Sequence, residues 1–279
     1  MNSLSQKLKK TELDILVSFI RACEELDLRY YVLGGTLLGA VRHRGFIPWD
    51  DDIDVGMPRA DYEIFLREGQ KYLEAPYFLQ TFRTDPQYTL NFAKIRNSST
   101  TFMETSLRGR NLNHGVYIDI FPLDFYPDDP GTERRLRRKN WFLAGRLAAD
   151  FFYAKKLPAR SRMKHLLCKL RHPSAEKVLR MREDLFRSVE AGSRLVNHCG
   201  AWGDREIMPI QWFGEGCELE FEGLKVRAPK QWHSCLTQLY GDYMTPPPPE
   251  KRIGHHYCDV IDLDRPYTNY MNGSCTARK

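Results

Sequence analysis

The chain has 279 residues, of which 42% are hydrophobic and 28% are charged, a composition typical of a globular protein with a real core. No apolar stretch approaches the ~20 residues that cross a bilayer, and the first residues lack the apolar centre of a signal peptide. The seven cysteines are scattered, which argues against a disulfide framework or a zinc site. We therefore expect a soluble, cytoplasmic protein.

The net charge of +6 is unevenly distributed along the chain. Residues 133–182 contain sixteen Lys or Arg and three acidic residues, a local balance of +13, so the remainder carries −7. Such a basic segment could contact anionic lipid, a polyanionic acceptor or nucleic acid. A set of solvated surface helices explains it equally well.

The first half of the chain alternates between predicted helices and strands. Apolar spacing predicts a helix over 8–27 and a strand over 30–33, and Thr36 is expected to cap a short helix over 36–42. A strand over 51–57 and a helix over 60–72 follow, with Pro58 in the first turn of that helix. Further strands are predicted at 77–83, 90–96 and 116–121. This interleaving favours a mixed α/β architecture.

The second half is predicted to be mostly helical at first. Helices are expected over 133–192, with breaks near Pro158 and Pro173. A hairpin over 217–228 is expected to turn at Glu222-Gly223. The remaining predictions are a helix over 230–240, an extended arm at 246–249 and a frayed tail over 268–279.

Four carboxylates lie within five residues, at Asp50, Asp51, Asp52 and Asp54. Two like charges 4 Å apart repel by about 1 kcal/mol in water and about 4 kcal/mol at a partly buried site. A cation relieves such repulsion, and hard carboxylate oxygens suit Mg²⁺ or Ca²⁺. Because Ile53 separates Asp52 from Asp54 as on a strand, we expect both acids on one face. A solvated acidic loop is the alternative.

A glycine turn precedes this cluster and a further acid follows it. Gly34, Gly35 and Thr36 begin the short helix, where backbone N–H groups can bind a phosphate. Asp119 lies between Ile118 and Ile120, where a buried acid is costly unless it is paired. Asp124 is the rival to Asp119 as the third carboxylate. The pattern predicts a metal site for phosphoryl chemistry.

One long motif covers residues 34–55 and reads Gly34-Gly-Thr-Leu-Leu-Gly-Ala-Val-Arg-His43, then Gly45-Phe-Ile-Pro-Trp-Asp-Asp-Asp-Ile-Asp-Val55. It resembles the signature of the LicD family of phosphotransferases, which is similar to the fukutin-related proteins and belongs to the wider nucleotidyltransferase superfamily. The resemblance continues through Tyr117-Ile-Asp-Ile-Phe-Pro-Leu-Asp124. It returns at Phe221-Glu-Gly, at Tyr240-Gly-Asp-Tyr-Met-Thr-Pro-Pro and at residues 252–256.

The resemblance implies an α/β fold with a nucleotidyltransferase-like mixed sheet flanked by helices and a basic helical insertion. It implies that Asp52, Asp54 and Asp119 bind Mg²⁺ or Mn²⁺ near the Gly34-Gly35 turn. The implied reaction transfers phosphocholine from CDP-choline, or ribitol phosphate from CDP-ribitol, to a sugar of a cell-surface glycan such as lipopolysaccharide or a teichoic acid, with release of CMP.

Several other side chains are candidates for binding the donor. Arg42 could hold a phosphate bidentately or form a salt bridge to Asp50 or Asp51. Lys94 and Arg96 alternate on one strand, so both could face the phosphates or form surface ion pairs. His255 could contact a phosphate or transfer a proton.

The sequence leaves open the roles of two aromatic residues and the identity of the proton acceptor. Trp49 and Tyr117 could cage a quaternary ammonium group by cation–π contact, although core packing is the favoured interpretation. The attacking hydroxyl needs a proton acceptor, for which Asp50 and Asp51 are the candidates.

We predict one catalytic domain over 1–279, with a core at 1–129 and a basic helical segment at 130–205. A C-terminal part at 206–267 and a tail at 268–279 complete it. The expected partners are CDP-choline or a related CDP-alcohol and a glycan acceptor that could be lipid-linked, with membrane contact through 133–182 at the inner face of the cell membrane. A nucleotidyltransferase that moves NMP from an NTP is the alternative. A nucleic-acid-binding protein is disfavoured because the basic segment lacks a recognisable nucleic-acid motif.

Overall fold

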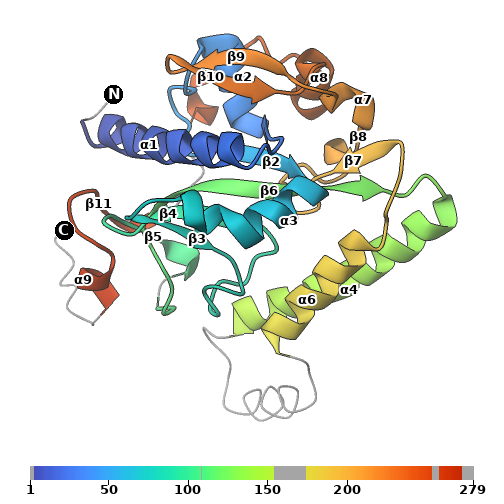
Figure 1. Ribbon diagram of the computed structural model, residues 1–279, viewed down its shortest axis with the longest axis horizontal. Coiled ribbons are helices and arrows are strands. Elements are labelled where there is room, and N and C mark those ends of the chain that lie inside the picture. The colour runs from blue at the N-terminus through green and yellow to red at the C-terminus, as the bar shows by residue number, and fades with distance from the viewer. Residues whose placement is uncertain (1–2, 108, 154–173, 253–257, 272–279) are drawn as a thin grey trace.

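The computed structural model describes residues 3–107, 109–153, 174–252 and 258–271, and it shows a mixed sheet covered by helices (Figure 1). Along its main path the sheet has the order β1-β2-β6-β4-β3. These strands are β1 (Tyr31–Val32), β2 (Asp54–Pro58), β6 (Val116–Tyr126), β4 (Ala93–Asn97) and β3 (Tyr77–Gln80). β2 and β6 run parallel, and the other neighbours on this path are antiparallel.

β6 is the longest strand and connects two parts of the sheet. Its first half lies between β2 and β4, and its last three residues pair with β7 (Arg194–Val196), which in turn pairs with β8 (Met208–Pro209). All residues of β6 except Phe125 are buried. A strand covered on both faces is expected to be continuously apolar, so the two acids within it, Asp119 and Asp124, need specific partners.

Two helices pack side by side against this sheet. α1 (Ser3–Glu25) contacts β4 and β6, and α3 (Arg59–Glu68) contacts β2 and β6. The rings of Phe19 in α1 and Phe65 in α3 meet edge to face with centroids 5.3 Å apart. η1 (Gly69–Tyr72) extends α3 by one turn of 3₁₀-helix. The core therefore lies between these helices and the sheet.

A second group of elements covers the glycine turn. α2 (Gly34–His43) packs against α8 (Trp232–Tyr240) and against the hairpin of β9 (Cys217–Phe221) and β10 (Leu224–Ala228), at the top of Figure 1. Phe46 and Phe221 join the loop after α2 to the hairpin, with ring centroids 4.9 Å apart. η3 (Gly203–Glu206) and α7 (Ile210–Phe213) lead into this group.

The remaining elements lie at the two ends of the molecule. α4 (Pro130–Tyr153) and α6 (Ala175–Arg187) pack against each other at the lower right of Figure 1. At the opposite end, β5 (Thr101–Glu104) pairs with β11 (Cys258–Asp262), followed by α9 (Thr268–Met271). Two 3₁₀ turns, η2 (Thr105–Leu107) and η4 (Pro249–Lys251), complete the described elements.

Most predicted elements are confirmed, and the mixed α/β class is correct. The hairpin has the predicted bounds, and its turn residues Glu222 and Gly223 both have positive φ, at 50° and 79°. Thr36 does not cap α2, because that helix begins at Gly34 with Leu33 as its N-cap. The helix predicted through residue 192 ends at Arg187, and β5, β7, β8 and β11 were not predicted.

The arm and the tail are also more structured than predicted. Pro249 begins η4, so the extended arm is one residue shorter than the proline run. Part of the predicted tail forms α9, and residues 272–279 lie outside the described part. The predicted helix breaks at Pro158 and Pro173 fall outside it as well.

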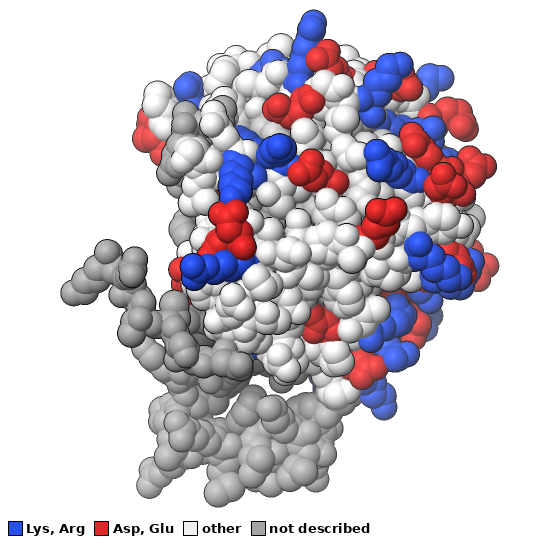
Figure 2. Space-filling view, turned by 60° about the vertical axis from the view of Figure 1, so that its left-hand side comes forward, with Lys and Arg blue, Asp and Glu red and all other residues white. Residues whose placement is uncertain are grey.

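Within the described ranges, no helix is both long enough and apolar enough to span a membrane. On the face shown in Figure 2, acidic and basic side chains are interspersed around a largely uncharged centre. This face therefore presents no extended surface of one charge sign.

Candidate active site

Two aspartates stand opposite each other in the sheet. Asp54 is the first residue of β2 and is the register partner of Asp119 in β6. Register partners on neighbouring strands project from the same face, so both carboxylates begin at adjacent positions. The expected strand over 51–57 begins three residues late, and Asp50, Asp51 and Asp52 lie in the loop before it. Asp52 therefore lies outside the strand, and the shared face of Asp52 and Asp54 stays a prediction.

The loop aspartates approach one another closely. One carboxylate oxygen from each of Asp50, Asp51 and Asp52 lies within 4.8 Å of the others, and all three residues are half-buried. Asp54 follows them at the start of β2 and is half-buried. Burial raises the pKa of Asp54 well above its usual value, and the charges of Asp52, Asp119 and Asp50 raise it further.

The glycine turn borders this cluster directly. Gly34 has a φ of +50°, and a Cβ placed on it would lie 3.2 Å from Oδ2 of Asp54. A Cβ on Gly35 would collide with the carboxylate of Asp50. Thr36 accepts a hydrogen bond from the backbone N–H of Asp54 through Oγ1, at 2.8 Å. The start of α2 and the acidic loop are therefore held together, and only glycine leaves room between them.

Lys94 supplies a cation on the same face. Its Nζ lies 2.7 Å from Oδ1 of Asp119 and 3.3 Å from the ring centre of Tyr117, and its side chain is 3% exposed. Lys94 and Asp119 are also register partners between β4 and β6. One lysine thus offsets part of the negative charge around Asp119 and Asp54.

Arg96 forms a buried ion pair, which differs from both predicted alternatives, a phosphate contact and a surface ion pair. It is fully buried, and its guanidinium donates to Gln80, to the carbonyl of Gly115 and to Glu104. It also stacks on Tyr117, with its Cζ 4.5 Å from the ring centre. Tyr117 is thereby a core aromatic packed between two cations.

Other predicted residues lie at the edge of the site. Arg42 donates to the carbonyl of Tyr243 at 2.6 Å, which ties α2 to the segment after α8. Trp49 is half-buried, and Arg252 lies over its ring at 5.2 Å. Asp124 forms a two-pronged ion pair with Arg59, at 2.6 and 2.8 Å, and so has a structural partner of its own. His255 lies outside the described residues.

Two polar residues of α1 approach the cluster and were not predicted. Glu12 is 2% exposed, its Oε2 has no hydrogen-bond partner among the described residues, and burial followed by the charges of Asp52 and Asp51 raises its pKa. Lys9 donates to the carbonyls of Ile47 and Pro48, at 3.0 and 3.3 Å, and so holds the loop before the acids. The sequence did carry a signal for Lys9 and Glu12, because both are charged residues at positions in the apolar stripe of an amphipathic helix.

Tyr240 is a third residue without a predicted role. Its hydroxyl lies 3.8 Å from where a Cβ of Gly34 would be. Burial and then the charge of Asp54 raise the pKa of this phenol, so it remains protonated and can donate a hydrogen bond toward the cluster. Tyr240 is the last residue of α8 and begins one of the segments that carry the family resemblance, but its contact with the site depends on how α8 packs on α2.

The donor set fits a hard divalent cation. Carboxylate oxygens converge from the loop and from two strands, Glu12 leaves a buried oxygen unpaired beside them, and two glycines keep the neighbouring space open. Oxygen ligands of this kind are those that Mg²⁺ and Mn²⁺ prefer.

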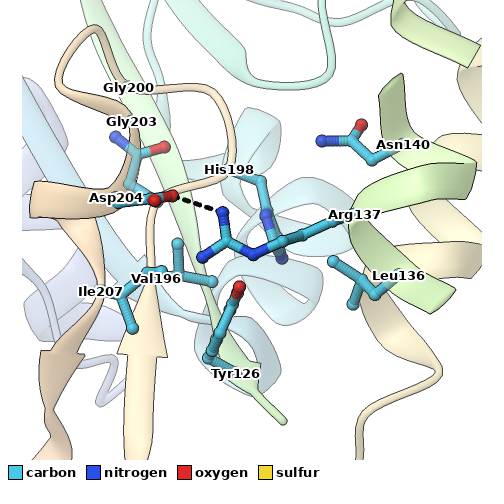
Figure 3. Close-up of a pocket in the computed structure, with 11 residues that line it drawn as sticks. Tyr126, Leu136, Arg137, Asn140, Val196, His198, Gly200, Gly203, Asp204 and Ile207 are labelled. Carbon is cyan, nitrogen blue, oxygen red and sulfur yellow. Dashed lines mark hydrogen bonds and ion pairs between the residues drawn. The ribbon is translucent and has the colours of Figure 1, made fainter. Parts of the chain in front are cut away.

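A separate cavity of about 130 Å³ lies between α4, the end of β6 and the loop after β7. In Figure 3, Arg137 extends across it toward Asp204, and the hydroxyl of Tyr126 points toward the Arg137 guanidinium. Tyr126 is seven residues from Asp119 along β6, which is roughly 23 Å at 3.3 Å per residue. This cavity is therefore distinct from the acidic cluster.

Comparison with known proteins agrees with the motifs. Residues 27–165 match the family described as LicD/FKTN/FKRP, nucleotidyltransferase domain. The chain is 33% identical over 261 residues to the lipopolysaccharide cholinephosphotransferase LicD of Haemophilus influenzae, an alignment that covers 90% of this chain and 95% of that protein. The chain belongs to the LicD family.

Other relatives share shorter segments with this chain. The ribitol 5-phosphate transferase FKRP of human and of mouse is 53% identical over 34 residues, which is 12% of this chain and 7% of FKRP. An uncharacterized Rickettsia prowazekii protein is 34% identical over 103 residues, which is 37% of this chain and 35% of that protein. Family membership confirms the expectation of a LicD-type phosphotransferase.

Proposed function

We propose that this LicD-family enzyme transfers phosphocholine, or a similar phospho-alcohol, from a CDP-activated donor to a sugar of a cell-surface glycan. The near full-length similarity to a lipopolysaccharide cholinephosphotransferase supports phosphocholine and lipopolysaccharide as the first substrates to test. The observation that carries the proposal is the meeting of Asp54 and Asp119 across β2 and β6, beside Asp50–Asp52 and Gly34.

In the proposed reaction, a sugar hydroxyl attacks the phosphorus that bears choline. A new P–O bond to the sugar forms, the bond from that phosphorus to the bridging oxygen breaks, and CMP leaves with the bond electrons. The hydroxyl proton passes to a carboxylate. Asp50 and Asp51 are the candidates for this general base, because they are half-buried at the outer edge of the cluster.

We propose that Asp52, Asp54 and Asp119 hold Mg²⁺ or Mn²⁺, with Asp50 and Asp51 beside them. When bound, the cation neutralises charge on the transferring phosphoryl group and on the leaving oxygen. Lys94 keeps Asp119 in place through its ion pair, and Lys9 fixes the entry to the acidic loop.

The donor phosphates are proposed to lie at the start of α2. The first N–H groups of a helix have no partners within the helix and carry partial positive charge, so Gly34, Gly35 and Thr36 can bind phosphate oxygens through the backbone. The missing side chains at Gly34 and Gly35 allow this approach next to Asp54 and Asp50. Arg42 and His255 remain proposed donor contacts.

The nucleotidyltransferase-like assignment of the fold is part of this proposal. It is supported by the description of the matching family and by the mixed sheet that carries the acids beside a glycine turn. The division into a core at 1–129, a basic segment at 130–205 and a C-terminal part at 206–267 stays a prediction. We also propose that the enzyme works at the cytoplasmic face of the cell membrane, where a lipid-linked acceptor would be accessible.

The direct test is incubation with CDP-choline, Mg²⁺ and a lipopolysaccharide core oligosaccharide, with mass detection of CMP and of the phosphocholine-modified sugar. CDP-ribitol and other CDP-alcohols are compared under the same conditions. CMP formation that depends on the acceptor supports the proposal. Turnover of an NTP to pyrophosphate without CDP-alcohol cleavage would instead establish the nucleotidyltransferase alternative.

A further inference from the structure

The outer face of α4 carries two large aromatic side chains in solvent. Trp141 is 78% exposed and Phe142 is 54% exposed. They are the most exposed tryptophan and phenylalanine among the described residues. Leu136 and Leu143 form the buried side of the same helix, so the aromatic pair faces away from the protein.

Basic residues share this face with the aromatic pair. Residues spaced by three and four lie on one side of a helix. Arg134 and Arg138 therefore align with Trp141, and Arg135 and Lys139 align with Phe142. All four basic residues are exposed. Arg146 lies over the ring of Phe142, with its Cζ 4.6 Å from the ring centre. We call these seven residues the α4 outer face.

This combination has a specific physical meaning. An exposed apolar patch bordered by positive charge marks a binding surface, because water disfavours the aromatics and nothing in the described structure covers them. Tryptophan and phenylalanine insert at the boundary between headgroups and acyl chains, and arginine and lysine attract anionic headgroups by ~1 kcal/mol each.

We propose that the α4 outer face docks on a bilayer surface that contains anionic phospholipid. This inference rests on the proposed function, since a lipid-linked glycan acceptor presents its sugar next to such a surface. Trp141 and Phe142 enter the interface, and Arg134, Arg135, Arg138 and Lys139 contact the headgroups. The enzyme lies on the membrane rather than across it.

The charges also disfavour a second copy of the chain as the occupant. Two α4 outer faces meeting about a two-fold axis would place the same four cationic residues against one another. An anionic bilayer satisfies the charge and the aromatic pair together. Single-stranded nucleic acid could also stack on aromatic residues, so it is included in the test.

The test uses the full chain and large unilamellar vesicles, either pure phosphatidylcholine or a 7:3 mixture with phosphatidylglycerol, in cosedimentation and tryptophan fluorescence. We expect binding to the anionic vesicles that weakens as salt is raised. The double variant Trp141→Ala/Phe142→Ala should lose about tenfold or more in affinity, because it removes two interfacial aromatics. Tyr72→Ala, at a 41% exposed aromatic on η1, is the matched control and should bind like the wild type.

Two readouts separate this inference from the catalytic proposal. Asp54→Asn should bind vesicles normally, and the double variant should release CMP at the normal rate with a soluble oligosaccharide acceptor. The inference would be overturned if the double variant bound anionic vesicles as tightly as the wild type does. It would also be overturned if the wild type bound both vesicle types equally. Tighter binding to an oligonucleotide than to anionic vesicles, or a dimer that the double variant dissociates, would overturn it as well.

Discussion

Asp54 and Asp119 are direct neighbours across the parallel pairing of β2 with β6, and Lys94 faces Asp119 from the opposite strand. Asp50, Asp51 and Asp52 lie in the loop before Asp54, so five carboxylates gather in this part of the protein. The raised pKa of Asp54 reflects this excess of negative charge and its burial. The protein maintains an electrostatically unfavourable cluster, which is the expected property of a site that binds a cation.

The first prediction concerns Asp54→Asn. The change removes a proposed metal ligand, together with a buried charge that its neighbours repel. Loss of a residue that only hydrogen-bonds to a metal ligand costs ~10–100-fold in activity, so loss of the ligand itself should lower transfer by more than this. The melting temperature should stay equal to that of the wild type or rise. CMP release and a thermal melt measure the two effects, and retained turnover would refute the assignment.

Asp124→Asn, on the neighbouring strand β6, is the matched control. It breaks the buried ion pair with Arg59, which keeps its ion pair with Glu63, and should lower stability by up to about 3–5 kcal/mol. Measured well below its melting temperature, this variant should retain transfer per folded molecule. If Asp124→Asn lost transfer and Asp54→Asn lost stability instead, the roles assigned to the two aspartates would be reversed.

The second prediction concerns added metal. Mg²⁺ that binds only the folded protein should stabilise it by ~2.7 kcal/mol at 100 times its dissociation constant. For a chain of this size that corresponds to a rise of about 5 °C or more in melting temperature. The rise should disappear in Asp54→Asn and should be reversed by a chelator. An equal rise in melting temperature for the wild type and for Asp54→Asn would show that the cation binds elsewhere.

The third prediction concerns Gly35→Ala. The new methyl group would collide with the Asp50 carboxylate, so the acidic loop must move and transfer should be lost in a protein that still folds. Gly145→Ala on α4 is the control, because its Cβ meets nothing within 4 Å. That control should gain roughly 0.5–1 kcal/mol of stability and keep its activity toward a soluble acceptor. Normal transfer by Gly35→Ala would exclude a tight glycine turn as a requirement.

The fourth prediction concerns Tyr240→Phe. Removing the hydroxyl leaves the ring packed on Trp202, whose centroid is 4.9 Å away, so the melting temperature should hardly change. Loss of one hydrogen bond near Asp54 should lower kcat/KM by about tenfold. Steady-state kinetics with varied CDP-choline measures this effect. An unchanged kcat/KM would show that the phenol has no role in the reaction.

The fifth prediction concerns stability in acid. Burial lowers the pKa of His198 to about 4, and the ring stacks on Phe186 with centroids 4.1 Å apart. Below its ordinary value of ~6.5 the unfolded chain binds a proton that the folded protein does not, so this contribution to stability is lost as the pH falls from 6.5 to 4. Relative to His198→Gln, the wild type should lose roughly 2 kcal/mol between pH 7 and pH 5.

The variant comparison is needed because a second group titrates in the same range. Burial raises the pKa of Glu206 to about 7, so its contribution is full below 4.5 and is lost as the pH rises to about 7. This opposite effect is present in both proteins and cancels in their difference. Urea denaturation at pH 5, 6 and 7 supplies the measurement. A constant difference across these pH values would show that His198 titrates normally.

Local patterns predicted the elements that depend on local forces. The amphipathic spacing of α1, the Glu222-Gly223 turn and the apolar run of β6 each reflect neighbours within a few residues, and each was located. The predicted ends were less accurate, since α1 begins five residues earlier and β6 ends five residues later than predicted. The return of the chain after α6 to form β7 was missed, because a three-residue strand is stabilised by its partner β6 rather than by its own sequence.

For the site, the amino-acid sequence by itself determined which residue types are present and therefore which chemistry to expect. A diglycine turn, a run of aspartates and one acid within an apolar strand are sufficient to predict phosphoryl chemistry with a metal, because each is costly without a ligand. Only the tertiary structure decided which groups meet there. Lys94, Glu12 and Tyr240 reach the cluster from elements distant in sequence, and packing of α1, β4 and α8 around the sheet brings them together. Electrostatic and packing energies between such elements depend on distances in space, which spacing along the chain does not encode.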